Sequence, residues 1–262
     1  MSELDDDTQL APAGEGAWAG SIHPRWNVGT APNGGYLIAL AARAMLAASD
    51  RPDPLTVTAH YVGPPEPGPV TVTTEVVRAG RRYATVAAAI RQGDRERVRL
   101  LGATGDLAAQ AGPTRVSAEP PSVPGPDACA PLTGDRLPQV HDRYDLRLPP
   151  DSPWFAGPAG DEPFEVTGWI RFADGAPPSA LALLAFADAF PPTVLNTLDV
   201  GWVPTIELTV HVRGRPAPGW VLGTFRTRFL VDGLLEEDGE LWGEDGRLLA
   251  HARQLALILP RR

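Results

Sequence analysis

The chain contains no lysine and a single cysteine among its 262 residues. Without lysine, a Schiff-base lysine and the phosphate-binding lysine of a P-loop are both excluded. Cys129 alone cannot form an internal disulfide or a cysteine-rich zinc site. Its Pro-rich surroundings indicate a thiol in a loop, so any catalytic chemistry is expected from other residue types.

Excess positive charge and long apolar runs are also missing. The formal net charge is -9, which argues against a nucleic-acid surface. No apolar run reaches the length that spans a membrane, and the acidic, small residues 1–15 lack the basic and apolar regions of a signal peptide. We expect a cytoplasmic protein with no membrane or nucleic-acid partner, in which residues 1–15 form a flexible tail.

Residues 16–107 are predicted to form one unit, in which a helix precedes an antiparallel meander. A short strand is expected at 18–23. Apolar residues recur at helical spacing from 34 to 48, and Asn33 suits the N-cap position before them. Strand candidates separated by turn residues follow at 55–62, 69–79, 82–92 and 96–106.

Residues 163–262 repeat this plan after a Pro- and Gly-rich linker at 108–162, whose length favours a domain boundary. The elements expected are a strand at 164–172, a helix at 178–190, and strands at 203–213, 219–231, 234–243 and 247–259. Thr58-Ala59-His60 and Thr209-Val210-His211 stand at the same distance before a turn, as a duplication would produce. One helix on a meander leaves an open strand edge, so we predict that the two units pair edge to edge in one sheet.

Polar side chains of the second half suit the activation of a water molecule. Asp188 could accept the proton of a water if burial beside flanking phenylalanines raises its pKa. The alternative is that Asp188 simply faces solvent near a helix end. Thr209 and Gln254 could orient the water. Glu207 shares a strand face with Thr209 and is the rival base, while strand alternation alone favours an ordinary polar outer face.

The first half offers backbone donors at a helix start. Pro32-Asn33-Gly34-Gly35-Tyr36 opens the predicted helix, and the first N–H groups of a helix have no intrahelical partner. Those donors could polarise a carbonyl group. The commoner role of a diglycine is to let the chain turn tightly, and the commoner role of Asn33 is to cap the helix.

The order of these motifs resembles that of the double hot-dog acyl-CoA thioesterases, in which two hot-dog units lie on one polypeptide. Besides the diglycine motif, the resemblance is carried by Gly80-Arg81-Arg82 and by the segments 184–190, 206–211 and 252–255. It extends over nearly everything from Trp18 to Pro260 apart from the linker. It implies an α+β double hot-dog fold, with two helix-plus-antiparallel-meander units merged into one continuous sheet.

The resemblance also implies a site and a reaction. The groups that hold the attacking water fall on Asp188, Thr209 and Gln254. The thioester carbonyl is expected at the start of the first helix, at Gly34, Gly35 and the amide of Tyr36, beside Asn33, where relatives commonly carry His. The implied reaction is hydrolysis of acyl-CoA or acyl-carrier-protein thioesters by direct attack of water. No cofactor and no metal are expected, and the implied assembly is a homo-oligomer, a dimer of double hot-dogs.

Two rival functions stay open. An enoyl-thioester hydratase or dehydratase on the same fold would need a His–Asp pair, with His23 or His60 reaching the acyl chain. A non-catalytic acyl- or polyketide-binding protein is the other rival, because a fold does not fix a function. Serine-nucleophile and dinucleotide chemistry find no support, since the sequence has neither a Gly-x-Ser-x-Gly elbow nor a Gly-x-Gly-x-x-Gly loop.

Overall fold

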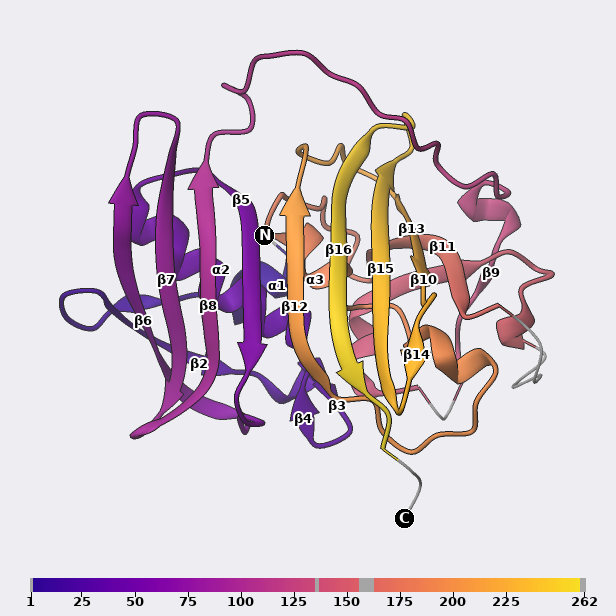
Figure 1. The fold of residues 1–262 in the computed structure, drawn as a ribbon, viewed down its shortest axis with the longest axis horizontal. Helices are drawn as coiled ribbons and strands as arrows, with labels where there is room; N and C mark the ends of the chain where they lie inside the picture. Colours follow the sequence, from indigo (N-terminus) through magenta and orange to yellow (C-terminus); the bar gives the residue numbers. More distant parts are fainter. Residues whose placement is uncertain (1, 135–136, 156–162, 260–262) are drawn as a thin grey trace.

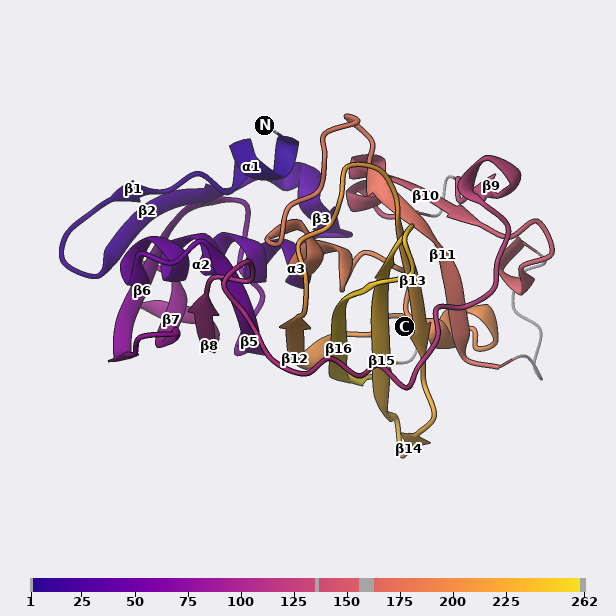
Figure 2. The ribbon, with the colours of Figure 1, turned by 90° about the horizontal axis from the view of Figure 1, so that it is seen from above.

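One antiparallel sheet of 14 strands runs through both halves of the chain (Figure 1). The structure is a computed structural model and describes residues 2–134, 137–155 and 163–259. Seen from above, the α-helices lie on one face of the sheet (Figure 2), which leaves the other face outside. The α+β class and the single continuous sheet are as predicted.

The leading unit has the expected order of elements. Helix α2 (Gly34–Ser49) buries most of its residues, because its apolar side chains and alanines repeat at helical spacing against the sheet. No helix among the described residues is both long and apolar enough to cross a membrane. The strands are β2 (Ala17–Ile22), β3 (Asn27–Val28), β4 (Ala31–Pro32), β5 (Asp53–Tyr61), β6 (Gly68–Ala79), β7 (Tyr83–Gln92) and β8 (Arg95–Gly105).

The trailing unit departs from prediction in its helix. The segment expected to be helical from 178 to 190 forms only the short helix α3 (Ala182–Phe186). Proline pairs at 177–178 and 191–192 flank it. A proline inside a helix lacks the N–H for the helical hydrogen bond and disfavours helical backbone at the residue before it. The strands are β11 (Glu165–Phe172), β12 (Thr205–Val212), β13 (Val221–Arg226), β14 (Leu230–Val231), β15 (Leu234–Gly243) and β16 (Leu248–Leu257). The single strand predicted at 219–231 is thus divided between β13 and β14.

The two units join where β5 lies antiparallel to β12. Thr58 stands opposite Thr209 across this junction, and their Oγ1 atoms are 2.9 Å apart. From β2 the sheet runs through β6, β7, β8, β5, β12, β16, β15, β13 and β11. Each unit therefore covers the strand edge that the other would leave open, as expected from the cost of an open edge.

The second part of the predicted linker belongs to the sheet. Strand β10 (Tyr144–Leu148) pairs with β11, and the short strand β9 (Ala130–Pro131) pairs with β10. The buried side chains of β10 alternate along the strand, at Tyr144, Leu146 and Leu148. The segment predicted as a linker at 108–162 thus includes a strand with buried side chains, and their period of two is the signal of a strand.

The first part of the linker is irregular and crosses the sheet. In Figure 1 it arcs from the end of β8 over the strand ends to the far side of the trailing unit. There Cys129 packs in an apolar cluster with Trp169, Trp220 and Trp242. The indole N–H of Trp169 donates to the backbone carbonyl of Pro124 at 2.8 Å. The linker thus packs on the trailing unit and covers aromatic side chains that would otherwise be exposed.

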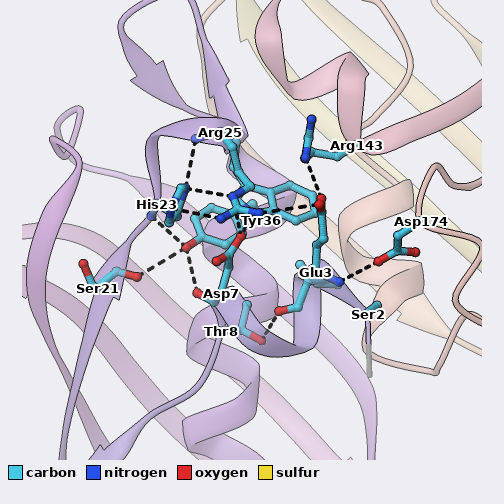
Figure 3. Close-up of polar contacts among 12 residues, drawn as sticks. Ser2, Glu3, Asp7, Thr8, Ser21, His23, Arg25, Tyr36, Arg143 and Asp174 are labelled. Carbon is cyan, nitrogen blue, oxygen red and sulfur yellow. Dashed lines mark hydrogen bonds and ion pairs between the residues drawn. The ribbon is translucent and has the colours of Figure 1, made fainter.

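The amino-terminal residues are not the flexible tail expected from their composition. Helix α1 (Glu3–Asp7) begins with a capping box between Ser2 and Asp5. Leu4 is buried, and the short strand β1 (Ala11–Pro12) pairs with β2. The Glu3 carboxylate forms an ion pair with Arg143 at 2.6 Å (Figure 3). Helix α1 therefore links the leading unit to the segment that precedes β10.

Candidate active site

The carboxylate of Asp188, just beyond α3, meets the start of α2. Its Oδ2 atom accepts hydrogen bonds from the Gly35 backbone N–H at 2.8 Å and from Asn33 Nδ2 at 2.9 Å. Asn33 Nδ2 also donates to the Asp188 carbonyl oxygen at 2.7 Å. A carboxylate at a helix N-terminus is stabilised by the free N–H groups and the helix dipole. The trailing unit thereby places an acid on the diglycine motif of the leading unit.

The two glycines permit this close contact. A Cβ atom on Gly35 would lie 2.9 Å from the carbonyl oxygens of Leu184 and Ala185, which are backbone atoms of α3. A Cβ atom on Gly34 would lie 2.5 Å from the Tyr61 hydroxyl oxygen and 3.0 Å from Asp188 Oδ2. Only a residue without a side chain fits at either position unless its neighbours move.

Burial raises the pKa of Asp188 from 3.8 to about 6. Desolvation disfavours the charged carboxylate, and the N–H groups of Gly35 and Gly34 and the Asn33 carboxamide counteract only part of this. At neutral pH the group is mainly ionised, yet its pKa is close enough to 7 for it to take and return a proton. This matches the requirement for a general base.

The backbone donors expected to hold a carbonyl oxygen already have acceptors. The Tyr36 N–H donates to Asn33 Oδ1 at 3.0 Å, so Asn33 caps the helix, while the Gly35 N–H donates to Asp188. The Tyr36 hydroxyl donates to the Asp7 carbonyl at 2.9 Å (Figure 3), and its ring stacks on that of Trp26. The sequence interpretation of the Gly35 and Tyr36 amides as free oxyanion donors is therefore corrected.

Gln254 belongs to a buried polar group on the helix-covered face of the sheet. Its Nε2 donates to Glu237 Oε1 at 2.8 Å, and its Oε1 accepts from Thr205 Oγ1 at 2.9 Å. These two bonds fix the orientation of the carboxamide within an apolar strand. Gln254 is only 7% exposed, so partners of this kind are required.

Thr209 does not join this group, which corrects the expectation from the resemblance. It stands opposite the exposed Arg253, on the outer face of the sheet, whereas Gln254 stands opposite the buried Leu208. The Thr209 hydroxyl donates to Glu207, which shares that outer face. The predicted shared face of Glu207 and Thr209 is thus correct, but it points away from α2 and α3.

Thr205 takes the position that was expected for Thr209. A β-bulge between Thr205 and Glu207 breaks the alternation of β12, because an extra residue in one strand shifts the following side chains to the other face. Thr205 therefore reaches Gln254, although regular alternation would place it with Glu207. Strand alternation read from the sequence could not show this.

Glu237 is the functional candidate that the sequence reasoning missed. Its side chain is only 5% exposed, and its Oε2 accepts from the Thr193 N–H at 2.8 Å. Desolvation raises its pKa, and the charge of Asp188 raises it further. The two carboxylates are thus electrostatically linked. The Glu236-Glu237-Asp238 run looks like a solvated surface in sequence, and only the position of Glu237 on the inner side of a strand could have indicated burial.

None of the described histidine side chains forms a hydrogen bond with Asp188. His23 hydrogen-bonds Arg25 near the start of β3. His60 is exposed on the outer face opposite Glu207, and the His211 ring packs against His251. Within residues 2–134, 137–155 and 163–259, no three His, Cys, Asp or Glu side chains are arranged as metal ligands.

Two surface cavities lie away from this site. One, of about 380 Å³, is lined by Arg43 and Leu46 near the far end of α2 and by the loop before α3. The other, of about 350 Å³, is lined by Glu165 and Thr167 of β11 and by residues before it. Neither is lined by Asp188, Gln254 or Tyr61.

Comparison with known proteins agrees with this architecture. Residues 22–106 match the family described as the acyl-CoA thioesterase N-terminal domain, and residues 119–258 match its C-terminal domain. The crystal structure of a proposed thioesterase II from Thermobifida fusca is 32% identical, with a TM-score of 0.90 over 98% of each chain. A hot-dog protein of unknown function from Alicyclobacillus acidocaldarius is 22% identical, with a TM-score of 0.88 over the whole of both chains.

Among curated sequences, an uncharacterized protein of Mycobacterium tuberculosis is 26% identical over 91% of this chain and 90% of its own length. The two domain matches together cover most of the sequence. The fold and the site therefore define a double hot-dog protein, and the chain belongs to the acyl-CoA thioesterase family. The resemblance found in the sequence is confirmed at the level of fold and family.

Proposed function

We propose that the protein hydrolyses acyl thioesters, carried by coenzyme A or by an acyl carrier protein, by direct attack of water. The observation that carries the proposal is the Asp188 carboxylate, which is held at the start of α2 by Asn33 and Gly35 and has a pKa of about 6. A base in this range serves proton transfer at neutral pH. Membership of the acyl-CoA thioesterase family supports the substrate class.

The proposed step needs no acyl-enzyme. Asp188 accepts a proton from water while the water oxygen bonds to the carbonyl carbon. The tetrahedral oxyanion then collapses and the carbon–sulfur bond breaks. The leaving thiolate takes the proton from Asp188, so the products are a carboxylic acid and a free thiol, and the carboxylate is restored.

We propose that Gln254 orients the water or the substrate from the sheet side. Its carboxamide is fixed by Glu237 and Thr205, so it would present one defined edge to a ligand. In this proposal Thr205 supports Gln254, and Thr209 on the outer face has no part in the reaction.

The test is a panel of acyl-CoA and acyl-carrier thioesters of different chain length, with free thiol and enoyl absorbance measured separately. Asp188→Asn is expected to lose thiol release by about 10²- to 10⁴-fold, the usual contribution of a general base. Asp94→Asn, an exposed turn residue between β7 and β8, makes the same charge change and is expected to keep full activity. Undiminished hydrolysis by Asp188→Asn would contradict the assignment of the base.

The same assay separates the rival functions. Loss of enoyl absorbance without thiol release would indicate a hydratase. The bonds of His23 to Arg25 and the outer-face position of His60 weigh against that reaction, because both histidines lack the pairing with Asp188 that it needs. Saturable binding without turnover would indicate an acyl-binding protein. We further propose a dimer of double hot-dogs, which sedimentation would detect as twice the mass of the chain.

A further inference from the structure

The hydroxyl group of Tyr61 is buried beside Asp188. No group among residues 2–134, 137–155 and 163–259 forms a hydrogen bond to its Oη atom, although that atom is shielded from solvent. A buried polar group without a partner is costly and uncommon. Such a group at a candidate site suggests a bond that is made only when a ligand is present.

The position of this hydroxyl is set by the diglycine motif. Tyr61 ends β5, and its side chain lies on the same sheet face as the buried Ala59 and Val57. Its Oη atom and Asp188 Oδ2 lie 2.5 and 3.0 Å from the same point, where a Cβ atom of Gly34 would be. The two oxygens therefore converge on one side of Gly34. They come from different units, one from β5 of the leading unit and the other from the residues just beyond α3 in the trailing unit.

Thioester hydrolysis leaves an unfilled role at this place. The oxyanion that forms when water attacks needs a hydrogen-bond donor. The N–H groups of Gly35 and Tyr36 cannot supply it without losing Asp188 and Asn33 as acceptors. A phenolic hydroxyl can donate one hydrogen bond, and that of Tyr61 is unused.

We propose that the Tyr61 hydroxyl donates a hydrogen bond to the thioester carbonyl oxygen and stabilises the oxyanion formed by attack of the water that Asp188 deprotonates. This inference rests on the proposed hydrolysis. The proton of Tyr61 stays on its oxygen throughout the step, and the proton of the water passes to Asp188 and then to the departing thiolate. Burial, together with the charges of Asp188 and Glu207, holds the pKa of Tyr61 well above its usual range, so the hydroxyl remains a donor at every working pH.

Tyr144 has a second buried hydroxyl without a partner among the described residues. Burial and the charge of Asp188 raise its pKa as well, but its contacts differ. Its ring is enclosed by the aromatic rings of Trp26, Phe172 and Phe186. The Tyr61 hydroxyl instead lies against Gly34, where the substrate carbonyl was expected from the sequence. Tyr61 is therefore the donor assigned to the reaction.

Tyr61→Phe tests the proposal, because it removes one oxygen and keeps the ring. We expect kcat on acyl-CoA to fall by about 10²- to 10³-fold, the range found when one oxyanion donor is removed. KM should change little, since the bond strengthens as the oxyanion forms. The melting temperature should stay the same or rise, because an unpaired buried hydroxyl is lost. A merely structural role of the hydroxyl would leave kcat unchanged.

Tyr83→Phe is the matched control, since Tyr83 is exposed on β7 and should keep the wild-type kcat. The pH profile adds a second readout. Tyr61→Phe should keep the rise in rate near pH 6 that belongs to Asp188, with only the plateau lowered. Wild-type kcat in Tyr61→Phe, together with an inactive Asp188→Asn, would overturn this inference alone. No hydrolysis by the wild type on any thioester would overturn the proposed function itself.

Discussion

Replacing Asp188 with asparagine should make the protein inactive and, above pH 6, more stable. Both hydrogen bonds to the carboxylate reach the same atom, Oδ2. A carboxamide oxygen at that place can accept both, so the contact with α2 is kept. The substitution removes the negative charge, whose desolvation is the main cause of the raised pKa. The protein thus carries a destabilising charge at the residue proposed as the base.

The magnitude follows from the pKa. A rise from 3.8 to about 6, at about 1.4 kcal/mol for each unit, means that holding Asp188 ionised in the fold costs about 3 kcal/mol. The raised pKa fixes the sign: the group destabilises the fold progressively as pH rises from about 4 to about 6, and the full cost applies above that range. The unfolding free energy of Asp188→Asn should therefore exceed that of the wild type by about 3 kcal/mol at pH 8 and by almost nothing at pH 4. For a chain of this size the gain at pH 8 corresponds to roughly 6–12 °C in Tm.

The assay is urea unfolding of the wild type and Asp188→Asn at intervals from pH 4 to pH 8. The quantity of interest is the difference in unfolding free energy, in which carboxylates that do not interact with Asp188 cancel. The pKa of Glu237, which the charge of Asp188 raises, should fall in Asp188→Asn, and this changes the difference in the same direction. Asp94→Asn should give no pH-dependent difference. If Asp188→Asn were less stable than the wild type at pH 8, the Asp188 charge would stabilise the fold, and the reasoning from desolvation would be refuted.

Three further predictions concern the same site. The hydrolysis rate of the wild type should rise with pH through about 6 and then level off, because only the ionised Asp188 can accept a proton; a flat profile from pH 5 to 8 would exclude it as the base. Thr205→Val should lower kcat about fivefold to tenfold, because Gln254 loses a hydrogen bond that fixes its orientation. Thr209→Val should keep a kcat near that of the wild type. Steady-state kinetics with the reverse order would indicate that Thr209, and not Thr205, takes part in the reaction. Gly35→Ala should cost about 1–3 kcal/mol of unfolding free energy, because its Cβ meets the backbone of α3; unchanged thermal unfolding would contradict the tight contact.

Much of the fold follows from local patterns. Helical spacing after Asn33 gives α2 close to its observed bounds, and alternating apolar residues between turn signals give β5 through β8. The proline pairs on either side of α3 are also visible in the sequence, but the apolar pattern between them suggests a longer helix than the five residues observed. The alternation of Tyr144, Leu146 and Leu148 is short, and Pro-rich surroundings obscured it.

The sequence by itself determined that two similar units occur, that a diglycine motif starts the first helix, and that one aspartate lies at the end of the second. These are properties of short segments, and they depend on side-chain periodicity and backbone freedom. Only the tertiary structure decided which residues share the site. A bulge in β12 brings Thr205 rather than Thr209 to Gln254. Contact between units engages the Gly35 amide and leaves the Tyr61 hydroxyl without a partner among the described residues. Strand register and the contacts between units depend on residues far apart in the chain, which no local pattern encodes.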